Sequence, residues 1–380
     1  MKKFLIVTIT AVVFICMSVF PVSAEEDSAL YDLSGVYNSL SDDAKQSLEN
    51  IGAGSADPNS LSQISFSSII SEIANTASQN VSSPLKGLVN ISALLLLCSI
   101  LTAYKSSLSN DISNTINIVS TLCITCAVVM PAINVIKSTA GVIEIASNIM
   151  LAYLPVMFTI MASSGQAVSG ASYYSMMIVA GEGVGQLSSK IIVPLLNMFL
   201  GISVTSSVSP DINLSGFVNL ISKTVKWLLS FAMMIFSALL SFKQIITTSL
   251  DDVTSRAVRF SLSSFIPIVG SALSDAYKTV QGSISLLKSG VGVFVIISIA
   301  VVFLPVILQS FMWILTLWLG KSTAEVLNLV QCSKLLESVS TVFSTLLAII
   351  LCIMAVYIIS TAIILITDRK STRLNSSHDD

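Results

Sequence analysis

The chain has 380 residues, of which 53% are hydrophobic and only 11% are charged, and its formal net charge is −2. Soluble domains usually carry about 25% charged residues, so most of this protein's surface is not expected to face water. The basic residues form no patch suited to nucleic acid, which excludes a nucleic-acid partner.

The first 24 residues have the pattern of a secretory signal peptide. Lys2 and Lys3 precede the apolar run Phe4–Phe20, and the small residues Val22–Ala24 precede acidic Glu25. An uncleaved first membrane helix is the alternative interpretation. Either interpretation places the next segment outside the cytoplasm.

Residues 25–86 form an acidic segment that we expect to be extracytoplasmic and helical. Ser41 followed by two aspartates predicts a short helix that Gly52 ends. A second helix is predicted over Phe66–Ala77, with Ile69, Ile70 and Ile73 on its apolar face. The segment contains few large apolar residues, so it is expected to lean on the membrane or on a partner.

Residues 87–367 are predicted to form a multi-span membrane domain of seven or eight helices, because a span needs about 20 mainly apolar residues. Helices are favoured over a barrel, since the apolar runs do not alternate. The expected spans are Gly87–Tyr104, Ile112–Ile136, Val142–Ser163, two within Ala171–Val208 that separate near Ser188–Lys190, Trp227–Ile246, Val291–Leu319 and Val339–Thr367.

The body also contains kinked helices and amphipathic connectors. Prolines inside the apolar runs remove a backbone donor and kink the helix. Connectors expected in the membrane interface are Leu214–Lys226, Ser249–Phe260 and Ser322–Glu337, the last starting with a capping box at Ser322. The predicted fold class is therefore all-α, a polytopic membrane bundle of kinked helices with a small extracytoplasmic helical segment.

Enzyme chemistry finds little support in the sequence. The single histidine, His378, lies in the terminal tail, so the usual general base and commonest metal ligand are missing from the body. Cys123 and Cys126 form a CxxC within an apolar run with no second pair, which indicates packing thiols. We therefore predict no catalytic residue, no cofactor and no metal.

A first candidate site combines Glu182, Gln186 and Lys190, which are spaced four residues apart inside an apolar region. This spacing places them on one flank of a continuous helix. A charge in such a region is costly and needs a partner or a function. A structural buried pair and a polar pathway or subunit contact both remain open.

A second candidate region follows the predicted span Trp227–Ile246. Its first part is predicted as a capped connector helix whose acidic start and basic end suit the helix dipole. The glycine-punctuated stretch Ser261–Leu287 is too polar for a span and fits a re-entrant hairpin. The candidate residues of this region are Asp251, Asp252, Arg256, Arg259, Pro267, Gly270 and Asp275.

The residues after the last apolar run differ from it abruptly. Asp368–His378 reads DRKSTRLNSSH, a string that one frame of a common short-read sequencing adapter encodes. We expect residues 368–380 to be a non-native tail, and an ordinary polar tail is the alternative.

The order of these parts resembles the stage III sporulation protein AE family. The stretches that carry the resemblance are Asp251–Arg256, Phe265–Gly270 and Leu273–Ala276, continuing to Gly292. The resemblance implies a subunit of a channel complex, similar to secretion systems, in the mother-cell membrane around the forespore. It also implies partners among other membrane and intermembrane-space subunits.

Two hypotheses follow. The first is a non-enzymatic, multi-pass subunit of this sporulation conduit, needed for late forespore development, in contact with the lipid bilayer and able to form a homo-oligomer. The alternative is a stand-alone secondary transporter for a small solute, a class that often shows inverted repeats and midplane charges such as Glu182.

Overall fold

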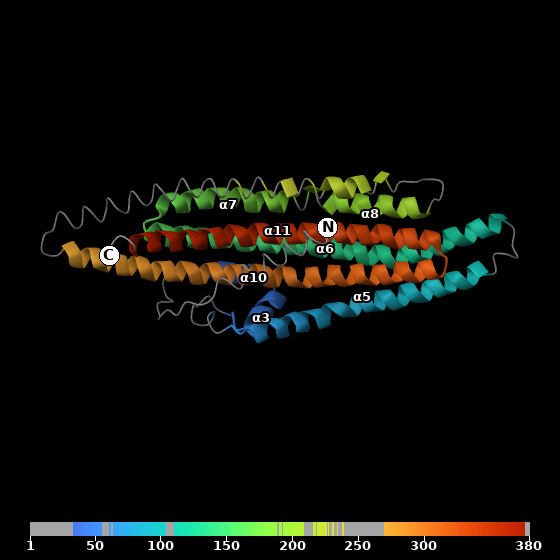
Figure 1. Ribbon diagram of the computed structural model, residues 1–380, viewed down its shortest axis with the longest axis horizontal. Helices are drawn as coiled ribbons and strands as arrows, with labels where there is room; N and C mark the ends of the chain where they lie inside the picture. Colours follow the sequence, from blue (N-terminus) through green and yellow to red (C-terminus); the bar gives the residue numbers. More distant parts are fainter. Residues whose placement is uncertain are drawn as a thin grey trace.

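The computed structural model describes residues 33–54, 61, 64–103, 110–187, 190–191, 193–208, scattered positions from 216 to 238, and 270–376. These residues form an elongated bundle of helices (Figure 1), which confirms the all-α prediction for this part of the chain. Four helices, α5, α6, α10 and α11, are long and apolar enough to cross a membrane. In chain order, the helices are α2 (Ser34–Asn38), α3 (Asp42–Asn50), α5 (Phe66–Ala103), α6 (Asn110–Ser163), α7 (Ala167–Leu187), α8 (Val193–Val208), α10 (Gly270–Val326) and α11 (Val330–Ser376).

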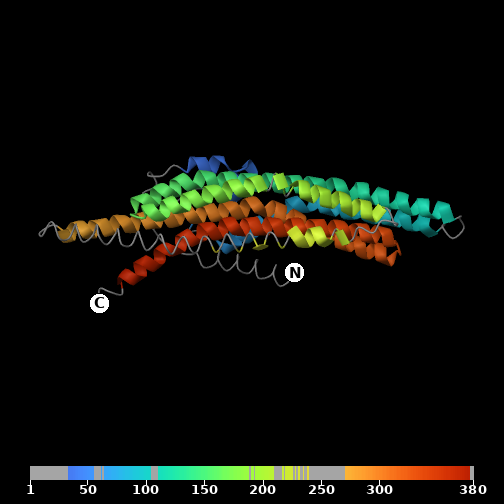
Figure 2. The same cartoon turned by 90° about the horizontal axis from the view of Figure 1, so that it is seen from above.

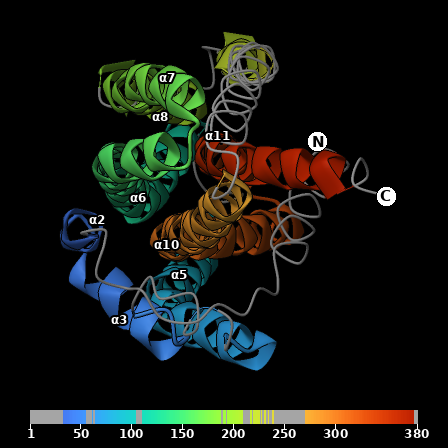
Figure 3. The same cartoon turned by 90° about the vertical axis from the view of Figure 1, so that its left-hand side faces the viewer.

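The long helices lie side by side along the length of the bundle (Figures 1 and 2). Viewed along that axis, α10 lies between α5, α6 and α11 (Figure 3), and it contacts all three. The pair α7 and α8 covers α6 and α11 on the opposite side from α5. The short helices α2 and α3 pack on the outside, against α6 and α10 respectively.

Helix α6 corrects the prediction of two separate spans over Ile112–Ile136 and Val142–Ser163. It is one helix of 54 residues with Pro131 and Pro155 inside it. At 1.5 Å per residue its length is about 80 Å, far more than one bilayer requires. The polar residues between the two predicted spans do not end the helix, since none of them requires a left-handed backbone.

Helix α7 ends at Leu187 and α8 begins at Val193. Between them, residues 190 and 191 have the wider hydrogen-bonding pattern of a π-helix, whereas 188, 189 and 192 lie outside the described residues. The predicted break near Ser188–Lys190 therefore stays a prediction.

Two tight turns join the long helices. Gly165, with φ of 82°, ends α6, and the amide of Gln166 donates to the Met161 carbonyl at 2.9 Å. Asn328, with φ of 56°, ends α10 in the same way, and the amide of Leu329 donates to the Ala324 carbonyl at 2.8 Å. Both are Schellman turns, which require a left-handed residue directly after the helix.

The second turn corrects the predicted capping box at Ser322. Ser322 lies inside α10, and its hydroxyl donates to the Trp318 carbonyl at 3.1 Å. The chain breaks six residues later, at Asn328, because that residue and not Ser322 adopts the left-handed conformation. On the two sides of this turn, Val326 is 86% exposed whereas Leu336 is buried.

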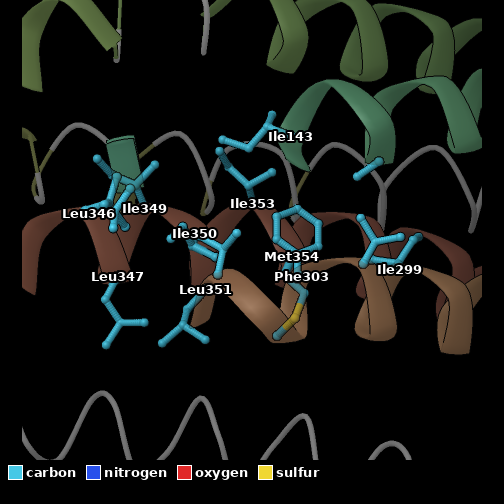
Figure 4. Close-up of a cluster of buried hydrophobic side chains, with 14 of the residues drawn as sticks. Ile143, Ile299, Phe303, Leu346, Leu347, Ile349, Ile350, Leu351, Ile353 and Met354 are labelled. Carbon is cyan, nitrogen blue, oxygen red and sulfur yellow. The ribbon is translucent and has the colours of Figure 1, made fainter. Parts of the chain in front are cut away.

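The core lies mainly between α10 and α11. Figure 4 shows Ile299 and Phe303 of α10 beside Ile350 and Met354 of α11, with Ile143 of α6 above them. Close approach depends on glycine at the helix crossings. A Cβ at Gly292 would overlap Leu365, and a Cβ at Gly87 of α5 would overlap the Trp313 ring. The Trp313 ring also stacks on Phe343 with centroids 5.9 Å apart.

The prediction for the short helix after Ser41 is confirmed. The Ser41 hydroxyl accepts a hydrogen bond from the Ala44 amide at 3.3 Å, and Gly52 adopts φ of 84° after the helix. Its apolar stripe, Ala44, Leu48 and Ile51, is buried. Local signals were sufficient here because a cap and a left-handed glycine act within a few residues.

The helix predicted over Phe66–Ala77 is present, but its predicted end is wrong. This stretch is the start of α5, which continues through Pro84 to Ala103. In this stretch Ile70 and Ile73 are exposed, whereas the polar residues Glu72 and Thr76 are buried. Glu72 accepts a hydrogen bond from the Asn50 side chain at 3.0 Å, so α3 covers the polar face.

Candidate functional site

The prediction that Glu182, Gln186 and Lys190 share one helix flank is only partly covered by the described residues. Glu182 and Gln186 lie near the end of α7, and Lys190 is exposed and helical, but residues 188–189 between them lie outside the described part. The side chains of Glu182 and Gln186 lie outside the described part of the structure, so their role stays a prediction.

The second candidate region is only partly described. Asp251, Asp252, Arg256, Arg259 and Pro267 lie outside the described residues. Gly270 and Asp275 lie in the first turns of α10, which continues as a helix to Val326. The predicted re-entrant hairpin over Ser261–Leu287 is therefore wrong for residues 270–287. Glycine lowers helix stability by about 1 kcal/mol, but it does not force a chain reversal in a helix that neighbours support.

The structure brings together a buried group of hydroxyls that sequence analysis did not single out. Tyr153 of α6, Tyr173 of α7 and Thr361 of α11 meet in the interior. The hydroxyls of Tyr153 and Tyr173 approach each other without reaching hydrogen-bond geometry. The Thr361 hydroxyl also donates to the Tyr357 carbonyl at 3.0 Å, while the buried Tyr357 phenol lies beside Ser147 of α6.

This hydroxyl cluster can position helices and exchange hydrogen bonds, but it has no group that would act as a strong base. Buried phenols that lack a full hydrogen bond are costly, so their presence at one point of a three-helix junction calls for a reason. Within the described residues, no three His, Cys, Asp or Glu side chains gather as a metal site. The cluster therefore suits packing and assembly.

A buried cation lies near the turn between α6 and α7. Lys288 of α10 is 1% exposed, and its Nζ donates to Gln166 Oε1 at 3.0 Å. The contact joins residues 122 positions apart and fixes α10 against the turn. In the sequence, Lys288 was one basic residue among several, and only the burial distinguishes it.

A second long-range contact joins the helical residues around Ser222 to α11. The hydroxyls of Ser222 and Thr345 lie 2.9 Å apart, and both residues are buried. Phe217 and Leu220 of the same segment are each 59% exposed. The segment predicted as an amphipathic connector thus turns a serine inward and two large apolar side chains outward.

The outward face of α6 is polar over much of its length. Lys137, Ser138, Glu144 and Asn148 are exposed on it, and Thr159 continues the row toward the end of the helix. Cys123 and Cys126 lie earlier on α6 and are exposed, which corrects their predicted role as packing thiols. The polar row lies where the sequence predicted membrane spans.

Comparison with known proteins decides the family. The family described as stage III sporulation protein AE matches residues 56–368. The chain belongs to this family. The resemblance noted in the sequence is thereby confirmed, and with it a connection to the third stage of sporulation.

The stage III sporulation protein AE of Bacillus subtilis (strain 168) is 28% identical over 151 residues, which is 40% of this chain and 38% of that protein. The aligned part thus spans well under half of the relative's length. No solved structure matches the chain significantly. The family match extends over α5, α6, α7, α8 and α10 and most of α11, so the hydroxyl cluster, Lys288 and both predicted site regions lie within it.

Proposed function

We propose that the chain is a non-enzymatic membrane subunit of a sporulation transport complex that links mother cell and forespore and is needed for late forespore development. The family match over residues 56–368 carries this proposal. The four long apolar helices support a multi-pass membrane protein, which is the form expected of such a subunit.

The chemistry of the described interior supports a structural role in such a complex. The hydroxyl cluster around Tyr153 and the Lys288–Gln166 contact join helices that are distant in sequence. Neither places a nucleophile beside a base, which is the minimum for most covalent or acid–base catalysis. The subunit would act by holding helices in place for its partners.

The proposal assigns the partner contacts to the exposed surfaces that lack an evident role within one chain. Ile70 and Ile73 form an apolar pair in the first turns of α5, at 50% and 39% exposure, and the proposal places these turns outside the cytoplasm. Exposed apolar side chains with polar neighbours are typical of protein contacts. Other subunits in the intermembrane space, or a second copy of this chain, would bind there.

The experiment is a deletion of the gene in its sporulating host, complemented by the intact chain or by the double variant Ile70→Ser/Ile73→Ser. Late forespore gene expression is the readout, and membrane accumulation of the chain is measured in parallel. We expect loss of late expression in the deletion strain and restoration by the intact chain. Normal late expression without the gene would refute the proposal.

The stand-alone transporter is distinguished by a second assay on the purified full chain in lipid vesicles. Uptake of a small solute driven by an ion gradient would favour that alternative. A complex purified from sporulating cells with further membrane subunits attached would favour the conduit.

A further inference from the structure

Contacts between α6 and α11 show how these two helices align along the bundle. The Thr361 hydroxyl of α11 lies 3.9 Å from Met150 Sδ of α6, and the two residues are 211 positions apart. Nearer the start of both helices, Cys332 of α11 lies beside Thr121 of α6, and this pair has the same offset. An equal offset at two separate points means that α6 and α11 run in the same direction, level with each other residue by residue.

The segment that contains Ser222 aligns with the middle of α6. The hydroxyls of Ser222 and Thr345 lie 2.9 Å apart, and the offset between α6 and α11 places Thr345 level with Asn134. In Figure 1 the described pieces of this segment (yellow-green) begin above α8 and continue back over α7, in the direction in which α6 also runs. Residues 222–238 therefore lie roughly level with residues 134–150 of α6.

This segment turns an apolar face outward at that level. Every described position between 216 and 238 is helical, and Ser222 is buried against the core. The large apolar side chains that are exposed on the segment, which we call the apolar side, are Phe217, Leu220, Trp227, Phe231 and Met234. The Trp227 and Phe231 rings stack with centroids 5.4 Å apart, which makes a continuous aromatic surface. Such a surface is unfavourable in water and suits lipid.

The outward faces of α5 and α6 are polar at the same level. Gly87 of α5 lies against Trp313, whose ring stacks on Phe343, so the part of α5 before Gly87 lies level with this part of α6. The exposed side chains here, which we call the polar side, are Asn75 and Gln79 of α5 and Asn134, Lys137, Glu144 and Asn148 of α6. Ile70 and Ile73, assigned above to a subunit contact, lie at its far edge on α5.

The polar side is not neutralised from within the chain. Among the described residues, its six side chains make no hydrogen bond and no ion pair. Lys137 and Glu144 are seven residues apart on α6, about 10 Å along the helix, so they do not pair with each other. Ionised and amide groups in this state need water or a polar partner, because contact with hydrocarbon is costly. The polar side therefore does not face lipid.

The two sides belong to one level of one bundle. Seen along the bundle axis in Figure 3, α5 and α6 lie on the left and below, whereas the yellow-green segment lies beyond α7, α8 and α11. A bundle surrounded by lipid would be apolar on both sides, and a bundle surrounded by water would be polar on both. The surroundings at this level are therefore lipid on one side and a polar space on the other.

Contact between the polar sides of two copies does not account for that space. Copies in one membrane share an orientation, so a two-fold pairing through α6 would place Lys137 opposite the same lysine of the second copy. Glu144 would likewise face its own copy, and like charges brought together across an interface oppose association. Around a water-filled space the same charges stay hydrated and apart.

We propose that in the assembled complex the polar side lines an aqueous passage, whereas the apolar side faces lipid at the same level. Amides together with one charge of each sign suit hydrophilic solutes and select only weakly by charge. The proposal rests on the function proposed above, because the passage belongs to the assembled complex.

The first test compares single cysteines on the two sides at matched levels. A chain whose six cysteines are replaced by alanine is produced in the sporulating host in place of the native chain, and late forespore expression is checked. Lys137→Cys and Asn148→Cys probe the polar side, and Trp227→Cys and Met234→Cys probe the apolar side. Membranes from broken cells, in which both membrane faces are accessible, are treated with a water-soluble maleimide.

We expect the polar-side cysteines to react roughly tenfold faster, because maleimide reacts with the hydrated thiolate and hydrocarbon suppresses it. Equal rates on the two sides would overturn the proposal, since the surroundings would then be the same. Polar-side cysteines that react in the chain produced alone, but not within the complex, would also overturn it, because a subunit would cover them. Asn134→Cys and Phe231→Cys form the substitute pair if a first variant does not accumulate.

The second test makes the α6 row of the polar side apolar without changing the core. Asn134→Leu/Asn148→Leu should reduce late forespore expression to that of the deletion strain, because an apolar wall disfavours water in a narrow passage. The chain should still accumulate and still co-purify with the subunits that the intact chain retains. Asn134→Ser/Asn148→Ser, which keeps the surface polar, and Phe231→Leu/Met234→Leu on the apolar side should both behave as the intact chain.

Normal late expression with Asn134→Leu/Asn148→Leu, in a host where deletion abolishes it, would overturn the proposal. Loss of the co-purifying subunits would also overturn it, since the row would then be a subunit contact. Normal late expression after deletion of the gene would instead refute the function proposed above, and the cysteine comparison would still decide whether the polar side is in water.

Discussion

Two tryptophans of α10 differ sharply in their surroundings and provide a matched pair for a stability prediction. Trp313 is 1% exposed and lies between Gly87 and Phe343, whereas Trp318, one turn further, is 63% exposed. We predict that Trp313→Ala strongly destabilises the bundle and that Trp318→Ala does not. The difference tests whether α5, α10 and α11 pack as described.

The magnitude follows from burial and from the cavity left behind. A buried tryptophan covers 150–250 Å², and replacement of a buried Phe or Trp by alanine costs about 3–5 kcal/mol in soluble cores. In lipid or detergent the transfer of apolar groups contributes little, so the loss of packing contacts dominates. We therefore expect about 2–4 kcal/mol for Trp313→Ala and less than about 1 kcal/mol for Trp318→Ala.

The assay uses native thiols as reporters of unfolding. Cys98 and Cys332 are buried, and the other four cysteines, including the exposed Cys123 and Cys126, are replaced by alanine in every chain compared. Reaction with a fluorogenic maleimide during heating of the detergent-solubilised chain then reports opening of the core. Trp313→Phe is a further control, since it keeps most of the ring volume and removes an indole N–H that lacks a described partner. Equal midpoints for Trp313→Ala and Trp318→Ala would refute the packing argument.

Further predictions concern a charge, a turn and a long-range contact. Glu182→Gln is expected to impair assembly or late forespore expression while the chain accumulates normally in membranes, and wild-type behaviour would count against a role for this carboxylate. Gly165→Ala should destabilise by about 1 kcal/mol, because φ of 82° disfavours a side chain, whereas Gly141→Ala, inside α6 with open space around it, should be neutral or stabilising. In a double-mutant cycle, Ser222→Ala and Thr345→Val should couple by about 0.5–1.5 kcal/mol in thermal unfolding, and strict additivity would contradict the 2.9 Å contact.

Sequence analysis predicted the features that depend on local chemistry. The cap at Ser41 and the left-handed Gly52 each act within a few residues, so the structure agrees with them. The family was also recognisable, because its motifs are contiguous in the chain.

The features that failed depend on what each helix face contacts. Ile70 and Ile73 were placed on one apolar face, yet that face is exposed and Glu72 is buried, where Asn50 of α3 donates to it. A hydrophobicity pattern cannot distinguish a face covered by protein from one covered by lipid, since both are apolar. The hydroxyl cluster around Tyr153 could not be predicted from the sequence either, because its members lie on three helices that are far apart in the chain.

The continuity of α6 has a mechanical consequence. A single helix of 54 residues, continuous through Pro131 and Pro155, is a stiff rod that contacts α5, α7, α8, α10 and α11 along its length. A rotation of the rod by about 5° around one end displaces the other by roughly 7 Å for its length of about 80 Å. Small movements imposed at one end therefore become large at the other.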